Sequence, residues 1–323
     1  GEIADLIGQL AGIARAYDTD LKSVVKLNLY LGKADHNKLL EAITKKISAT
    51  WPAGRQPALT IIPGKLIGGG VLAGDAVILS AKKGGPIDRF ERDAAMMPSD
   101  RDIIYISGRA AKGELGEATA GTMKQLFEVL KGMGSKRENV IQVKAFIRPM
   151  EKWEKVEQEI ETSFAGAPLP PVVYVEWSSS SVATEIEIIA AAEGKTASKD
   201  GVSYFTPAGE KASPVYSKAA RIHADEVIYI GGIVGAVAAP AKAQVKSLYS
   251  GLELISKQAG SSLRHFVKAT YYVSDSEVSA ALNQLRPEYY DPERPPAASK
   301  VAIPALLEKK RGLLIDMVAV PQE

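Results

Sequence analysis

Apolar side chains recur with a helical spacing at three places along the chain, and each place precedes a segment rich in β-forming residues. Within each stretch the apolar residues fall on one stripe of a helix, with a one-residue slip in the second stretch. The stripe residues are Ile3, Leu6, Leu10 and Ile13; Met123, Phe127 and Leu130; and Val245, Leu248, Leu252 and Ile255. The pattern predicts three amphipathic helices of the same kind.

A strand is predicted after each of these helices, over residues 24–31, 140–147 and 265–273. Aligned on Lys26, Lys144 and Lys268, the three strands are 118 and 124 residues apart. A second helix follows each strand, and two more strands follow that helix. The second helices are expected over 36–49, 150–164 and 276–289, and the closing strands over 58–62 and 75–80, 172–177 and 184–190, and 300–303 and 313–320. Because the same order occurs three times, the sequence predicts three tandem units.

The second and third units also open with a strand that ends in a glycine step, over 103–108 and 227–232. The chain begins inside the first helix, so we expect unit 1 to lack its leading strands. Polar, Gly/Pro-bearing linkers cover 82–101 and about 191–213, and 201–206 is expected to form a leading strand of unit 3. We therefore divide the chain into unit 1 (1–81), unit 2 (82–191) and unit 3 (192–323), with an α+β fold. A complete unit has the order β-β-α-β-α-β-β.

Composition narrows the chemistry of the 323-residue chain. It has no cysteine, which excludes disulfides, thiolate metal sites and a cysteine nucleophile. Its three histidines are too few and too scattered for a histidine metal site, and nothing in the sequence supports a site of carboxylates alone, so we expect no metal and no cofactor. Neither His223 nor His265 has a Ser or Asp partner at a recognisable spacing, so both are expected to be structural rather than catalytic. With 40 Lys and Arg against 38 Asp and Glu, the chain lacks the charge excess that favours nucleic acid. No apolar run is long enough to span a membrane, and we expect a cytoplasmic protein.

Several short runs resemble the YjgF/RidA family of enamine and imine deaminases, which older descriptions call endoribonuclease L-PSP. The runs are residues 214–219 followed by 227–232, 104–108, 185–190, 296–301 and 314–319. Members of this family are typically homotrimers in which sheets enclose a central core and helices lie outside, as in chorismate mutase-like folds. The resemblance implies that this one chain carries three RidA-like units and forms an intramolecular pseudo-trimer. Further self-association stays open.

The resemblance also implies a site between units. An arginine after a Pro-Ala turn would pair with a substrate carboxylate, a Glu fifteen residues later would orient water, and a Tyr and the backbone near a Ser-Gly step would help hold the substrate. Carried over to this sequence, the expected catalytic residues are Arg55, Asp75 and Glu185. The expected substrate-binding residues are Tyr216, Ser107, Gly108 and Gly232.

The chain departs from this pattern in every unit. Arg55 and Asp75 are 20 residues apart rather than fifteen, the arginine position of unit 2 falls on Pro170, and unit 3 has Ala298 and Leu314 at the two positions. A composite site would pair Tyr216 of unit 3 with Arg55 and Asp75 of unit 1. Three functions therefore stay open: an imine or enamine hydrolase with one residual site for a small carboxylate or imino acid, a non-catalytic binder or structural pseudo-trimer, and, with least support, an RNA-binding protein or endoribonuclease.

Overall fold

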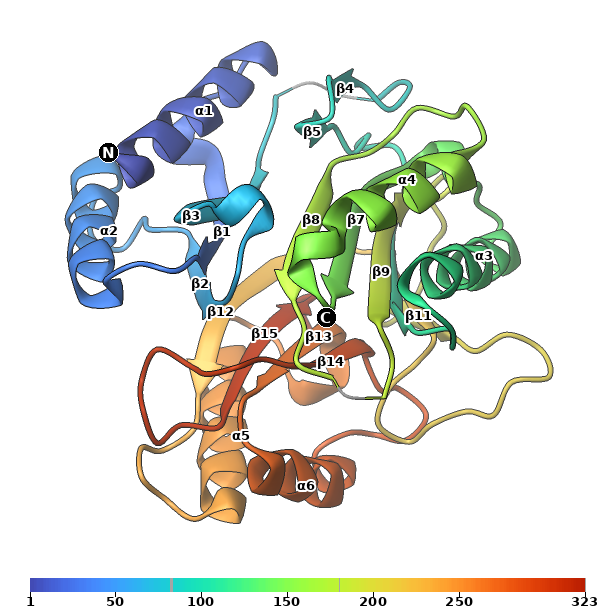
Figure 1. Cartoon of the computed structure of the whole chain (residues 1–323). Helices are drawn as coiled ribbons and strands as arrows, with labels where there is room; N and C mark the ends of the chain where they lie inside the picture. The colour runs from blue at the N-terminus through green and yellow to red at the C-terminus, as the bar shows by residue number, and fades with distance from the viewer. Residues whose placement is uncertain (82–83, 180, 323) are drawn as a thin grey trace.

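The computed structural model describes residues 1–81, 84–179 and 181–322; residues 82–83 of the linker expected over 82–101 lie outside this described part. Figure 1 shows three pairs of helices at the periphery of the molecule and the main strands toward its centre. Among the described residues, six α-helices form, and none is long and apolar enough to cross a membrane. The order helix, strand, helix, strand, strand occurs three times, starting at α1, α3 and α5.

Unit 1 forms a three-stranded sheet in the order β2-β1-β3, with β1 parallel to β2 and antiparallel to β3. Its second helix begins at His36 and is capped by Asp35, whose side chain accepts hydrogen bonds from the backbone N–H groups of Asn37 and Lys38. The elements of unit 1 are α1 (Glu2–Ala16), β1 (Val24–Leu31), α2 (His36–Thr50), β2 (Ala58–Pro63) and β3 (Leu72–Ile78).

Unit 2 contributes four strands to a larger sheet and also carries a short two-stranded hairpin in its leading linker. The strand β6 pairs with β9, which pairs with β7, and β7 lies parallel to β8. The elements are β4 (Arg89–Phe90), β5 (Ala94–Ala95), β6 (Ile103–Arg109), α3 (Leu115–Gly132), β7 (Val140–Ile147), α4 (Trp153–Phe164), β8 (Val172–Glu176) and β9 (Thr184–Ala191).

Unit 3 divides its strands between two sheets. Its own four-stranded sheet has the order β12-β15-β13-β14, whereas β10 and β11 join the sheet of unit 2 in the order β10-β11-β6-β9-β7-β8. The strand expected over 201–206 therefore forms, but it extends the sheet of the preceding unit. The elements are β10 (Val202–Phe205), β11 (Ala219–Ile222), β12 (Ile228–Val234), α5 (Ala241–Gln258), β13 (Phe266–Val273), α6 (Ser276–Leu285), β14 (Ala297–Ala302) and β15 (Leu313–Ala319).

The alignment on three lysines is wrong for unit 2. The strands β1, β7 and β13 each have eight residues, and Lys26 and Lys268 are third in their strands, whereas Lys144 is fifth. The residues that match across the three strands are instead Asn28, Lys144 and Thr270, because each lies opposite an acidic residue of the closing strand. These acidic residues are Asp75, Glu187 and Asp316. A shift of two residues keeps a side chain on the same face of a strand, so the pattern of apolar and polar positions does not reveal it.

Each helix pair closes a core of its own against one face of its sheet. Trp51, Phe164 and Tyr249 are fully buried in these three cores. A fourth cluster contains Tyr30, Phe146 and Tyr272, which are the seventh residues of β1, β7 and β13. Equivalent strand positions of the three units therefore pack together on the faces that the helices do not cover.

Candidate functional site

Three buried ion pairs, here called the central ion pairs, each join two units. Lys26 of unit 1 pairs with Asp316 of unit 3 at 2.6 Å between Nζ and Oδ2, and Lys268 of unit 3 pairs with Glu187 of unit 2 at 2.7 Å. Lys144 of unit 2 lies 3.5 Å from Asp75 of unit 1. Each unit thus gives one lysine and one carboxylate, and the pairs link the units in a closed cycle.

Asp75, expected to be catalytic, belongs to these central ion pairs. Its carboxylate accepts hydrogen bonds from the Tyr30 hydroxyl at 2.7 Å and from the Asn28 amide at 2.9 Å. Burial alone lowers the pKa of Lys144, but Asp75 and other acidic groups outweigh it, so the pKa of Lys144 is raised and the ammonium stays charged. The Asp75 carboxylate is thus held by three groups, Lys144 of unit 2 and Tyr30 and Asn28 of unit 1.

Arg55 lies apart from Asp75 and outside any strand. It is exposed, in a turn in which its N–H donates to the carbonyl of Pro52, three residues before β2 begins. Ala58 of β2 and Ala297 of β14 lie opposite the equivalent residues Lys26 and Lys268. In this register the residue of unit 1 that matches Ala298 is Leu59, not Arg55.

The same register places the equivalent residue of unit 2 at Val172, which lies opposite Val143. Counting along the chain had placed it at Pro170, two residues too early. The position at which the family resemblance expects an arginine therefore holds Leu59, Val172 and Ala298. None of these three side chains carries a charge that binds a carboxylate.

The junction of units 2 and 3, here called junction 2–3, brings four of the expected residues to one place. A bulge in the pairing of β6 with β9 falls at Ser107 and Gly108 and turns their polar groups toward unit 3. The Ser107 hydroxyl donates to the carbonyl of Ser217 at 2.5 Å and accepts the N–H of Ala298 at 2.7 Å. The N–H of Gly108 donates to the Ser299 hydroxyl at 3.1 Å.

Glu185 lies directly over Gly108, on β9 of the same unit. A Cβ placed on Gly108 would lie 2.1 Å from Oε1 of Glu185, so only glycine leaves room for this carboxyl group. Burial, with the nearby charge of Glu187, raises the pKa of Glu185 to about 8, although Lys268, Ser299 and Lys300 oppose the shift. Glu187 lies two residues further along the strand, is paired with Lys268 and accepts the Ser299 hydroxyl.

Two unit 3 residues complete this junction. Tyr216 directly precedes Ser217, and its hydroxyl accepts a hydrogen bond from Lys218 at 2.8 Å. Lys300 lies on β14, and its pKa is lowered by burial and by the nearby Arg286, while Glu185 acts in the opposite direction. Lys300 was not among the residues expected from the sequence, since nothing in the local pattern signals that it lies beside Glu185.

Gly232, the remaining expected residue, lies at the junction of units 3 and 1, here called junction 3–1. The pairing of β12 with β15 has its bulge at Gly231 and Gly232. A Cβ on Gly231 would lie 2.6 Å from the carbonyl oxygen of Leu59, and one on Gly232 would lie 3.1 Å from Leu314. Leu314 lies opposite Tyr272, as Glu185 lies opposite Phe146, so a leucine stands here in the place of the glutamate.

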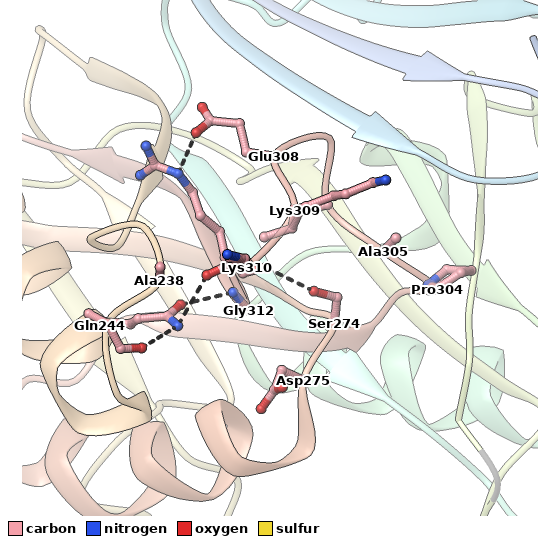
Figure 2. A pocket seen from close by; sticks show the side chains of 13 residues that line it. Ala238, Gln244, Ser274, Asp275, Pro304, Ala305, Glu308, Lys309, Lys310 and Gly312 are labelled. Carbon is pink, nitrogen blue, oxygen red and sulfur yellow. Dashed lines mark hydrogen bonds and ion pairs between the residues drawn. The ribbon is translucent and has the colours of Figure 1, made fainter. Parts of the chain in front are cut away.

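A cavity of about 610 Å³ lies in unit 3, between the segment that leads into α5 and the loop that follows β14. Figure 2 shows Gln244 bonded to the backbone of Gly312 and Lys310, with Lys309 among the other residues that line the cavity. Its volume falls within the range of small-molecule sites. None of the residues expected from the sequence lines it, so it is separate from both junctions.

His223 has the polar partners that its sequence spacing did not suggest. Its Nε2 lies 2.7 Å from the Ser203 hydroxyl and its Nδ1 lies 3.1 Å from Oδ2 of Asp102. The same carboxylate oxygen accepts Nε of Arg221 at 2.8 Å and the N–H of Thr196 at 3.0 Å. Because Oδ2 is shared by several donors, the cluster anchors the linker to β6 and β11. Among the described residues, no group of three or more His, Asp or Glu side chains is placed to hold a metal ion.

Comparison with known proteins agrees with the resemblance in the sequence. A family model described as Endoribonuclease L-PSP matches residues 93–192 and 209–321. A YjgF-family protein from Neisseria meningitidis is 23% identical over 38% of this chain and 96% of its own, with a TM-score of 0.29. A Rid-family protein from Yersinia pestis is 20% identical over 37% and 98%, with a TM-score of 0.33, and a YjgF/YER057c/UK114-family protein from Mycobacterium tuberculosis is 24% identical over 36% and 98%, with a TM-score of 0.27. No curated protein matches the chain. Since the two matched segments cover well over half of the sequence, the chain belongs to the Endoribonuclease L-PSP family of YjgF/RidA proteins.

Proposed function

We propose that the chain is an intramolecular pseudo-trimer of RidA-like units with a single working site, at junction 2–3, which hydrolyses imino acids of the 2-aminoacrylate type. The units are those of residues 1–81, 82–191 and 192–323, with β10 and β11 reaching back to the sheet of unit 2. The central ion pairs support the arrangement because each of them ties one unit to the next.

The observation that carries the site is the carboxyl group of Glu185. Its pKa of about 8 keeps most of it protonated at neutral pH, while Glu187 beside it is paired with Lys268. Two neighbouring carboxyl groups in such different settings are typical of acid–base chemistry. Ser107, Gly108 and Tyr216 lie at the same junction, on the two units that meet there.

In the proposed reaction Glu185 transfers protons in two stages, the addition of water and the loss of ammonia. The Glu185 carboxyl group gives its proton to the imine nitrogen as a water oxygen adds to the imine carbon, and the resulting carboxylate takes the extra proton from the added water. The Glu185 carboxyl group then protonates the carbinolamine nitrogen as the carbon–nitrogen bond breaks, and its carboxylate takes the proton of the hydroxyl group as the carbonyl forms, so that ammonia and a 2-oxo acid leave. Glu185 ends protonated, as it began.

The test is hydrolysis of 2-iminopropanoate, generated in situ from alanine by an amino-acid oxidase, with semicarbazide competing for the imine. Glu185→Gln keeps the shape of the side chain and removes the acid, so it should lower the rate by about 10²-fold or more. Glu41→Gln, on the exposed face of α2, is the matched control and should leave the rate unchanged. Hydrolysis that Glu185→Gln leaves intact would refute the assignment.

A second function, a non-catalytic binder or structural pseudo-trimer, is favoured by one observation: the three apolar residues Leu59, Val172 and Ala298 stand where the resemblance expects an arginine. This reading predicts that the wild-type protein hydrolyses no imino acid above the rate in buffer. The endoribonuclease activity that the family description names is tested by incubating the same protein with RNA and measuring cleavage. RNA cleavage that persists in Glu185→Gln would need a site other than junction 2–3.

A further inference from the structure

Two positively charged side chains of unit 3 lie near junction 2–3, Lys300 beside Glu185 and Arg286 beside Lys300. Lys300 donates from Nζ to Oδ1 of Asn283 at 3.0 Å and to the Ser279 hydroxyl at 3.4 Å, and both acceptors are neutral groups on α6. Arg286 follows α6, and no acidic group of the described residues lies within 4.0 Å of either cation. The charge of Lys300 and Arg286 is therefore not balanced by an ion pair.

Arg286 is the more buried of the two, with 8% of its surface exposed. Its Nε has no hydrogen-bond partner among the described residues, and its guanidinium lies 5.1 Å from the centre of the Tyr271 ring. Tyr271 is the β13 residue paired directly with Lys300. Lys300 reaches α6 from β14, and Arg286 lies over the Tyr271 ring on the neighbouring strand, so both cations lie on the face of the sheet that α6 covers.

The strand alternation puts Ala298 on that same face, two residues before Lys300. Ala298 adds only a methyl group there, so the positive charge of this face comes from Lys300 and Arg286. Glu185 does not balance it, because burial keeps this carboxyl group largely protonated at neutral pH. A cation held away from water without a counter-charge is costly, and a bound anion removes that cost.

We propose that Lys300 and Arg286 together bind the anionic group of the ligand at junction 2–3, and that this ligand is a small monocarboxylate such as a 2-imino or 2-oxo acid. The inference rests on the proposed function for the place of the site, but its cations come from a different strand position and from the end of a helix. Lys300 supplies a movable ammonium group and Arg286 supplies planar N–H donors, which together suit a carboxylate.

Pyruvate, the stable 2-oxo acid product of the proposed reaction, is the probe. Its binding to the full chain is measured by isothermal titration calorimetry at neutral pH and low salt. Lys300→Met should weaken binding by about tenfold or more, because a charge-assisted hydrogen bond is lost, whereas Lys300→Arg should restore it to within about threefold of the wild type. Arg286→Lys, which keeps the charge but not the fork of donors, should weaken binding less than Lys300→Met does.

Lys309→Met is the matched control, since Lys309 is an exposed lysine of the same unit that lines the cavity in Figure 2. This variant should bind pyruvate as the wild type does. Wild-type protein that does not bind pyruvate would overturn the proposal, as would unchanged affinity in Lys300→Met. A loss of affinity confined to Lys309→Met would place the anion in the cavity and would also overturn it.

The proposal and the hydrolase assignment fail in different ways. Glu185→Gln should keep pyruvate binding while it loses hydrolysis, because Glu185 is not the anion-binding group. Binding that depends on Lys300 in a protein without hydrolysis would support the anion site and refute the hydrolase. Hydrolysis with the same KM in the wild type and in Lys300→Met would support the hydrolase and refute the anion site.

Discussion

Junctions 2–3 and 3–1 both contain a β-bulge in the leading strand, but the groups that contact the bulge differ. In both, a bulge at a small-residue step of the leading strand faces the next unit, at Ser107–Gly108 and at Gly231–Gly232. At junction 2–3 the bulge meets a hydroxyl and lies beneath Glu185, whereas at junction 3–1 it packs on the backbone of Leu59 and the side chain of Leu314. The two junctions thus share one backbone geometry, with polar groups at one and apolar packing at the other.

Each of the two junctions contains one of the central ion pairs. Breaking one of these pairs should lower the free energy of unfolding more than the other substitutions do. Lys268→Met leaves Glu187 buried without its partner, so we expect the free energy of unfolding to fall by about 3–5 kcal/mol. Lys26→Met should have a similar effect at junction 3–1, where it strands Asp316. Urea denaturation measures both changes.

The double variant Lys268→Met/Glu187→Leu is the control for stranding a charge. It should recover most of the lost stability, because no uncompensated carboxylate is left. A single variant that loses less than about 1 kcal/mol would contradict the view that the central ion pairs hold the units together.

Adding a methyl group to the glycine of each bulge should separate the two junctions in activity. Gly108→Ala pushes its Cβ into the carboxyl group of Glu185, so imino-acid hydrolysis should fall by about 10²-fold. Gly232→Ala meets only the side chain of Leu314 and should change the rate by less than about twofold. Equal losses in the two variants would show that the junctions do not differ as described.

The pH dependence of stability should report Glu185 at junction 2–3, with nothing equivalent from Leu314. The pKa of Glu185 is raised to about 8 in the folded chain from 4.5, so the folded state holds the proton more tightly than the unfolded state. The stability contributed by this proton is complete below about pH 4.5 and is lost as the pH rises to about 8. Relative to Glu185→Gln, the wild type should therefore lose on the order of 2–4 kcal/mol between pH 5 and pH 8.5. Parallel curves for the two proteins would contradict the raised pKa.

The smallest effect is expected at Arg55, which the sequence had suggested as the carboxylate-binding residue. It is exposed in a turn before β2, so Arg55→Ala should change the unfolding free energy by no more than about 0.5 kcal/mol. Imino-acid hydrolysis should also be unchanged within error. A loss of activity in this variant would return the candidate site to unit 1.

The sequence predicted the helix pairs and the strands because their apolar periodicity is strong and repeats in order. It did not predict which residues of the three units are equivalent, since a two-residue shift of Lys144 along its strand keeps the side chain on the same face of the sheet. The misplacement of Asp75 has the same cause, because Ala73, and not Asp75, lies opposite Tyr30 as Glu185 lies opposite Phe146.

The sequence pointed to junction 2–3 through short runs on both units, with Ser107 and Gly108 in 104–108, Glu185 in 185–190 and Tyr216 in 214–219. The structure brings these residues together, and their role in a working site is our proposal. Lys300 and Arg286 were missed because their significance depends on which unit adjoins which, and the partners of His223 were missed because Asp102 lies 121 residues away in the chain. Contacts between units depend on three-dimensional packing that local patterns do not encode.

The most direct test of the account is the pH–rate profile of 2-iminopropanoate hydrolysis by the wild type and by Glu185→Gln. We predict that kcat/KM of the wild type falls with an apparent pKa of about 8, as the Glu185 acid loses its proton, and that Glu185→Gln loses about 10²-fold in rate together with this dependence. A variant that keeps both the rate and the pH dependence of the wild type would contradict the claim that the working site lies at junction 2–3.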